Sequence, residues 1–244
     1  MNLQIRTLII DSSQRNTIIY PSNNSWVYQL KDYKQIEQIN LIGAIIANSQ
    51  YIINPNNFVL TVNNGGTDYY FSITNGNYTP TSLASELQTR LNTNLFASVF
   101  TVNASTVTSK FTFTSTLPVI YKFGLNLSLG RVCGFNANTA STTSVVSTNN
   151  YQVNSTRYYK VIIDEINNTV DTNILPTNFT FLIPNNCNTG EFNYLNNLNN
   201  VNNKISVKQR EFPSRFTFKI FDEDNFLVLL NGIEYIFTLE ITFG

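Results

Sequence analysis

The chain has 244 residues, carries 15 basic and 15 acidic residues, and contains no histidine. Charged residues make up 12% of the sequence, about half of the usual share, so there is no long-range field to hold nucleic acid or an anionic membrane. The missing histidine removes the commonest general base, the commonest metal ligand and the usual partner of a nucleophilic serine or cysteine. Composition therefore argues against nucleic-acid binding and makes an enzyme a minority hypothesis.

The N-terminal part of the chain predicts three strands, at residues 3–10, 25–30 and 36–48. The third strand is apolar on both faces in its second half, which indicates a central strand that is covered by an insertion or a neighbouring subunit. Ile42 and Ile46 on this strand are therefore candidate interface residues. Its alternating faces are Ile39, Leu41, Gly43 and Ile45 on one side and Asn40, Ile42, Ala44 and Ile46 on the other.

A turn follows the first strand and offers two interpretations. Asp11 with the two serines after it is typical of a turn that its own side chains hold together. Arg15 is alternatively an ion-pair or hydrogen-bond hook to another subunit. We therefore count Asp11 and Arg15 among the candidate interface residues, together with Ile42 and Ile46.

The middle of the chain predicts a hairpin and then one helix. Strands at 58–62 and 69–74 flank the turn sequence NNGG at 63–66. Thr79 can act as N-cap with Pro80 at the first helical position, and leucines recur every four residues in the segment that follows. We expect a helix near residues 80–93 with a leucine stripe against a sheet.

Strands return in the C-terminal half, at 98–103, 106–114, 158–165 and 179–183, and the chain closes with two strands of strict period-two alternation between 215 and 244. Residues 136–156 are rich in Ser, Thr and Asn and predict an exposed loop, and 185–203 predict an irregular loop or a short helical turn. The pattern indicates an all-β fold: a jelly-roll β-sandwich of two antiparallel sheets with one inserted helix. We expect a single domain over 1–244 with loop insertions at 136–156 and 185–203.

No residue pattern indicates chemistry. Cys133 and Cys187 are expected to be free buried thiols. The acidic turn at 222–224 supplies too few oxygen ligands for calcium, and no pair of carboxylates is singled out for glycoside hydrolysis. We therefore expect no catalytic, cofactor-binding or metal-binding residues and no cofactor. The start of the chain lacks a signal-peptide pattern, and no apolar run approaches the length of a membrane span, so we expect neither secretion by a signal peptide nor a membrane span.

Four short segments carry a family resemblance: IDSSQR at 10–15, GNYT at 76–79 before the leucine helix, LGRVCGF at 129–135 and LNGIEY at 230–235. In this order they resemble segments of the single jelly-roll penton or minor capsid proteins of virophages and large icosahedral DNA viruses. The resemblance covers most of the chain in outline. It implies a vertex protein that forms homopentamers, meets the double jelly-roll major capsid protein and lies in the virion capsid.

Two further functions stay open from the sequence. The chain could be another minor capsid or fibre-base protein, or a carbohydrate-binding attachment domain. Tyr69 and Tyr70, or Tyr158 and Tyr159, would then supply an aromatic platform for a sugar ring. The penton hypothesis, by contrast, predicts a closed ring of five subunits built through heterologous contacts.

Overall fold

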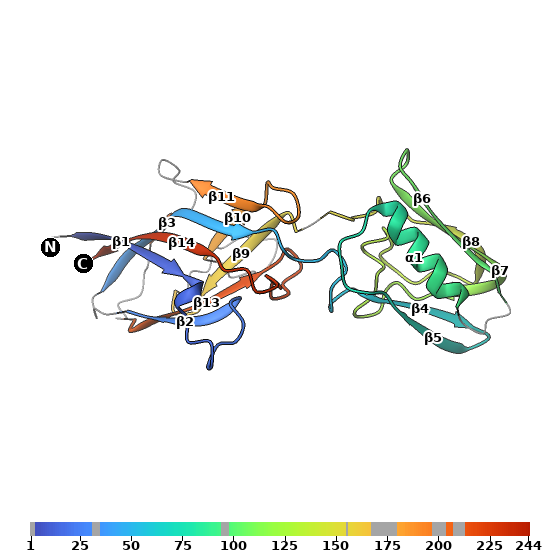
Figure 1. The fold of residues 1–244 in the computed structure, drawn as a ribbon, viewed down its shortest axis with the longest axis horizontal. Helices are drawn as coiled ribbons and strands as arrows, with labels where there is room; N and C mark the ends of the chain where they lie inside the picture. The colour runs from blue at the N-terminus through green and yellow to red at the C-terminus, as the bar shows by residue number, and fades with distance from the viewer. Residues whose placement is uncertain are drawn as a thin grey trace. The chain divides into compact units, whose positions relative to one another are not determined.

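The protein forms two compact units, here called unit 1 (Met1–Gln50 with Ser155–Gly244) and unit 2 (Tyr51–Asn154). The computed structural model describes residues 3–30, 35–93, 98–154, 156–166, 180–196, 204–206 and 213–244 (Figure 1). The sequence predicted one domain over 1–244, whereas residues 51–154 gather around an apolar core of their own. The chain is therefore a jelly roll that is interrupted by an inserted unit.

Unit 1 is a sandwich of two antiparallel sheets. One sheet has the order β1-β14-β3-β11, with the short β12 also paired to β3, and the other has the order β10-β9-β13-β2. Counted along unit 1 without β12, these orders are 1-8-3-6 and 5-4-7-2, which is the double Greek-key arrangement of a jelly roll. The predicted fold class is therefore confirmed. The strands are β1 (Gln4–Asp11), β2 (Ser25–Gln29), β3 (Ile36–Ala47), β9 (Tyr158–Ile163), β10 (Phe181–Pro184), β11 (Phe192–Asn196), β12 (Lys204–Ser206), β13 (Arg215–Phe221) and β14 (Ile236–Phe243).

The core of unit 1 lies between these two sheets and is formed by alternate residues of each strand. In β14 the buried side chains of Phe237, Leu239 and Ile241 alternate with partly exposed residues, as the period-two pattern predicts. Across the core, Trp26 donates a hydrogen bond from Nε1 to the Tyr235 hydroxyl at 2.6 Å. The polar end of each of these two side chains is thereby satisfied inside an apolar layer.

Two register shifts between β3 and β14 change which β3 residues face the core. Thr238 pairs with Gly43 but Leu239 pairs with Leu41, so Ile42 is an extra residue at a β-bulge. The bulge reverses the alternation, and Ile39, Leu41, Ala44 and Ile46 all turn inward. Most of the apolar residues of β3, which the sequence placed on two faces of the strand, therefore point toward the core.

Unit 2 contains a sheet of order β5-β4-β7-β6, with β8 also paired to β7, and one helix. The helix is capped by Thr79, begins with Pro80 and buries its leucine stripe, as predicted. Gly65 and Gly66 both have positive φ angles in the β4–β5 turn, which confirms the predicted hairpin. The elements are β4 (Val59–Asn64), β5 (Thr67–Ser72), α1 (Pro80–Asn92), β6 (Phe100–Ser105), β7 (Lys110–Tyr121) and β8 (Thr142–Val146).

Two segments predicted as loops contain strands. Within 136–156, β8 pairs with β7, because the run from Thr142 to Val146 is rich in β-branched residues and Val145 packs against the core of unit 2. Within 185–203, β11 pairs with β3, so this part of the segment is a strand and not the predicted irregular loop or short helical turn. Residues 197–203 of this predicted loop lie outside the described part of the chain.

Candidate interaction surface

The side of the β1-β14-β3-β11 sheet that faces away from the core, here called the outer face, carries large apolar side chains. Residues that pair across antiparallel strands share a face, so Tyr194, Ile45 and Ile236 form one row across the sheet. Along β1, Ile5 and Ile9 lie on the same face and are 63% and 62% exposed. Tyr194 is 71% exposed. The outer face therefore presents apolar groups on both edge strands and in the centre.

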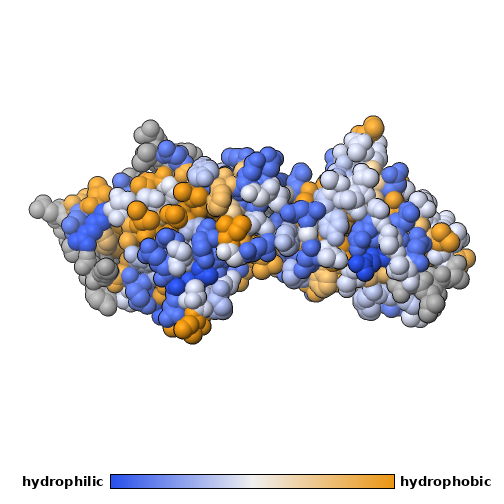
Figure 2. Space-filling model, viewed as in Figure 1, coloured by the Kyte–Doolittle hydropathy of each residue, from blue (hydrophilic) through white to orange (hydrophobic). Residues whose placement is uncertain are grey.

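These apolar groups share the outer face with the polar side chains of Thr238, Glu240 and Thr242 on β14. Figure 2 shows apolar residues over the part of unit 1 where Figure 1 places β1, β14 and β3. Single exposed apolar side chains are ordinary on protein surfaces, whereas several of them on one face are a candidate site of interaction. The outer face is therefore the candidate functional surface of unit 1.

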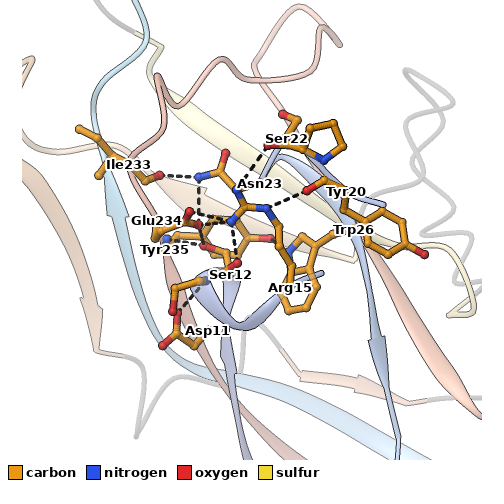
Figure 3. A network of polar contacts seen from close by, with 12 residues as sticks. Asp11, Ser12, Arg15, Tyr20, Ser22, Asn23, Trp26, Ile233, Glu234 and Tyr235 are labelled. Atoms are coloured by element: carbon orange, nitrogen blue, oxygen red, sulfur yellow. Dashed lines mark hydrogen bonds and ion pairs between the residues drawn. The ribbon is translucent and has the colours of Figure 1, made fainter. Parts of the chain in front are cut away.

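A polar network fixes one end of this sheet (Figure 3). The Arg15 side chain is 7% exposed, and its Nη1 donates to Glu234 Oε1 at 2.6 Å. The same guanidinium donates to the backbone oxygens of Ser12 at 2.7 Å and Tyr20 at 3.0 Å. It thereby joins the segment after β1 to the turn before β14, two regions that are more than 200 residues apart in sequence.

Glu234 is held in its charged form by three donors. Burial would raise its pKa, but hydrogen bonds from Arg15, from the Ser12 hydroxyl and from the Asn23 amide outweigh it and lower the pKa below the ordinary value. The Ser12 hydroxyl also accepts a hydrogen bond from the backbone N–H of Tyr235 at 2.8 Å. The network is closed within unit 1 and stabilises the fold, because its donors and acceptors are paired with one another.

The four predicted interface residues lie in different environments. Asp11 is on the outer face of β1, and its carboxylate accepts from the Ser13 backbone N–H at 2.9 Å, so the self-held turn is present. Arg15 is engaged inside the subunit. Ile42 is partly exposed at the bulge, and Ile46 is fully buried in the core because the bulge turns it inward. Surface positions that the sequence reasoning missed are Ile5, Ile9, Ile45, Tyr194 and Ile236, and the alternation within residues 3–10 could have identified the first two.

The acidic turn after β13 is a structural turn. Both Asp224 and Phe226 donate backbone N–H groups to Asp222 Oδ1 at 2.9 Å, and Asn225 adopts a positive φ angle. Desolvation raises the pKa of the Asp222 carboxyl despite these hydrogen bonds. Among the described residues, no three or more potential ligands are placed so that they could hold a metal ion. Cys133 and Cys187 are free thiols as expected, but only Cys133 is buried, and Cys187 is partly exposed. Desolvation raises the pKa of the fully buried Cys133 thiol, which keeps it protonated and unreactive.

Unit 2 presents a smaller aromatic and polar surface on the hairpin formed by β4 and β5. Tyr70 is 68% exposed and lies on the same strand face as Asp68. Lys122 donates to Asp68 Oδ2 at 2.6 Å, and the Asn63 amide donates to Asp68 Oδ1 at 2.5 Å. The hydrogen bond from Lys122 lowers the pKa of the Asp68 carboxyl, so this carboxylate is charged at neutral pH.

The chain belongs to a protein family of unknown function, DUF5901, whose model matches residues 4–217. No curated protein has a sequence that matches this chain. Among solved structures, the crystal structure of the SeMet-labeled mavirus penton protein is similar, with 11% sequence identity, a TM-score of 0.43 and all of both chains covered. At this identity and TM-score the likeness assigns neither function nor site residues to this chain. No helix within the described residues has the length and apolarity needed to cross a membrane.

Proposed function

We propose that this protein is a structural subunit of a virion shell, and more specifically a penton that forms a homopentamer at the five-fold vertices. In this role it contacts a double jelly-roll major capsid protein around it. The observation that carries the proposal is the group of exposed apolar side chains on the outer face of a jelly-roll sheet, a fold found in viral capsid proteins. The function is performed by shape and by contact between subunits rather than by chemistry.

Energetics favour association through such a face. Removing apolar surface from water contributes about 25 cal/mol per Å², and a standard interface buries about 800 Å² on each partner. Part of this gain is offset by the lost freedom of the docked subunits. A net charge of zero leaves no long-range repulsion between identical copies, so the apolar contact is not opposed electrostatically.

The vertex position is supported by the sequence resemblance to penton and minor capsid proteins. Two of the resembling segments, 10–15 and 230–235, meet in the Arg15–Glu234 network. A network that fixes the end of β1 and the start of β14 keeps the β1-β14-β3-β11 sheet in one geometry. Fixed geometry is what a closed ring requires, since a small change in the angle between copies would leave the ring open.

A reconstruction of assembled particles tests this function. The penton proposal expects density for this chain, with its jelly-roll unit, at the five-fold axes. Density for the chain elsewhere in the shell would make it another minor capsid or fibre-base protein. Absence of the chain from the particle would overturn the structural role altogether.

A second function, carbohydrate binding, is favoured by Tyr70 in unit 2. An exposed aromatic ring beside a charged carboxylate, an amide and an ammonium group offers both stacking and hydrogen bonds to a sugar. Glycan-array binding that Tyr70→Ala abolishes would support it. Tyr51→Ala is the matched control, because Tyr51 is an exposed tyrosine of unit 2 outside the hairpin. No binding by the wild-type protein would rule this function out.

A further inference from the structure

We propose that neighbouring copies pair edge to edge, with β1 of one subunit adding as an antiparallel strand to β11 of the next. The β1-β14-β3-β11 sheet would then continue from subunit to subunit around the ring. This inference rests on the proposed function, because it specifies how the head-to-tail contact of the ring is made. The evidence is the direction of the backbone groups at the two edges of the sheet.

The free side of β1 presents a row of backbone groups. Among the described residues, β1 pairs only with β14, and its register has no shift along eight residues. Ser12 continues this register and donates its N–H to Tyr235 O at 3.0 Å. Hydrogen-bonded and non-bonded pairs alternate in antiparallel strands, so every second residue of β1 directs its N–H and C=O away from β14. These residues are Ile5, Thr7, Ile9 and Asp11.

The opposite edge of the same sheet is complementary. Asn48 donates its N–H to Glu191 O at 2.9 Å, directly before the paired stretch of β11 and β3. By the same alternation, Asn193 directs its backbone groups toward β3, whereas Phe192 and Tyr194 direct theirs away from the sheet. On both edges, the residues with outward backbone groups also place their side chains on the outer face.

Strand direction makes the contact antiparallel without any change in the fold. Each neighbouring pair in the order β1-β14-β3-β11 is antiparallel, so the two edge strands of the sheet run in opposite directions. In a ring all copies are related by rotation, and β1 of one copy meets β11 of the next in opposite directions if the ring axis runs broadly along the strands. Such a contact is heterologous and closes on itself.

The β1 edge lacks several of the features that normally protect an edge strand. Such strands are usually short, contain proline or a bulge, or carry an outward charge. β1 has no proline and no bulge, and its outer face carries Ile5, Thr7 and Ile9 before the charged Asp11; its other charged residue, Arg6, lies on the opposite face. β10, an edge of the other sheet, is only four residues long and ends in Pro184. β1 is therefore a better template for strand addition than β10.

Side chains at the two edges suit each other. Pairing would place β-branched residues of β1 beside Phe192 and Tyr194 of the next copy, and pairs of aromatic and β-branched residues stabilise antiparallel strands. Neither group carries a charge that would have to be desolvated. A second copy is thus the occupant that the edge strands themselves specify.

Two lysine variants test the contact. Ile9→Lys changes one edge and Tyr194→Lys the other, and Val107→Lys between β6 and β7 is a control at an exposed apolar residue of unit 2. In sedimentation velocity and native mass spectrometry, the wild type is expected to form oligomers up to five as concentration rises. Each edge variant should raise the dissociation constant by about tenfold or more, whereas the control should not. Unchanged fluorescence of Trp26 checks that the two edge variants fold, and an unchanged circular dichroism spectrum checks the control in unit 2.

Mixing the variants distinguishes a heterologous contact from a symmetric one. Ile9→Lys protein keeps an intact β11 edge and Tyr194→Lys protein keeps an intact β1 edge, so an equal mixture should form dimers that neither variant forms alone. Dimers of Tyr194→Lys alone would indicate a β1–β1 contact and overturn the proposal. A wild type that stays monomeric at the highest soluble concentration and yields no cross-linked oligomer would also overturn it.

The outcomes separate this inference from the penton assignment. If rings of five form but the edge variants leave them unchanged, the strand pairing is refuted while the ring stands. If edge pairing is found but particle reconstructions place the chain away from the five-fold axes, the penton assignment fails while the pairing stands.

Discussion

Replacing Arg15 by Met should destabilise unit 1 selectively. The substitution keeps an unbranched side chain of similar length but removes the guanidinium that donates to Glu234 and to the backbone oxygens of Ser12 and Tyr20. Glu234 then remains as a partly buried carboxylate without its cationic partner. The backbone oxygens also lose a charged donor.

The magnitude follows from the burial of the two partners. Removing one partner of a fully buried ion pair costs about 3–5 kcal/mol, and an exposed pair contributes less than about 1 kcal/mol. The Arg15 side chain is 7% exposed and the Glu234 side chain 33% exposed, so the pair lies between these limits. We expect a loss of about 2–3 kcal/mol in the free energy of unfolding of unit 1.

The chain supplies its own reporter for this measurement. Trp26 is the single tryptophan and lies in the core of unit 1, so its fluorescence follows the unfolding of that unit in denaturant. The matched control is Arg90→Met in unit 2, which removes an exposed pair with Glu86 that is worth about 0.3–0.5 kcal/mol. An Arg15→Met protein whose Trp26 transition coincides with the wild-type transition would refute the energetic role of the network.

Three further predictions follow from the structure. Leu87→Ala should cost about 2–4 kcal/mol in the unfolding of unit 2, measured by circular dichroism, because Leu87 is fully buried on α1, and the Trp26 transition should stay in place. The lowered pKa of Glu234 means that its contribution to stability is complete above its ordinary value of 4.5 and is lost as pH falls through the folded pKa, so Glu234→Gln should flatten the acid limb of a stability–pH curve. Chelator and reductant should leave the melting temperature unchanged, since the two thiols are free; a drop of many degrees with either would contradict this.

Local elements of this fold are predictable because their signals are short-range. The alternation in β14 depends only on neighbouring residues, and the α1 start depends on Thr79, Pro80 and the leucine spacing that follows. The turn at Gly65 and Gly66 is equally local, because both positions require positive φ angles. Pattern and structure agree where a strand or helix keeps one face toward the core without a bulge.

The division into two units is not predictable in this way. Residues 48–51 join β3 to unit 2 without glycine, proline or a run of charge to mark a boundary. Long-range contacts define the boundary instead: the Ser49 hydroxyl donates to Leu230 O at 2.8 Å, and the Gln50 amide donates to Asp222 Oδ2 at 3.2 Å. Such partners are known only once the chain has folded.

The candidate surface was misplaced on β3 for a related reason. Strict period two puts Ile42 and Ile46 on one face, but an extra residue at the bulge turns Ile46 into the core and leaves Ile45 on the outer face. A bulge depends on the register with β14, nearly 200 residues later in the chain. The ion-pair partner of Arg15, Glu234, is also distant in sequence. The residues next to Arg15 in the chain therefore do not predict its role inside the subunit.

The position of the insertion is compatible with both proposals, a subunit contact through β1 and β11 and a carbohydrate site at Tyr70 in unit 2. The chain leaves unit 1 after β3 and returns before β9, and these two strands belong to different sheets of the sandwich. The insertion therefore replaces a connection between sheets and leaves every strand pairing within each sheet intact. Neither edge strand, β1 or β11, is joined directly to unit 2. Sequence change around Tyr70 in unit 2 therefore leaves the strands of the proposed jelly-roll contact unchanged.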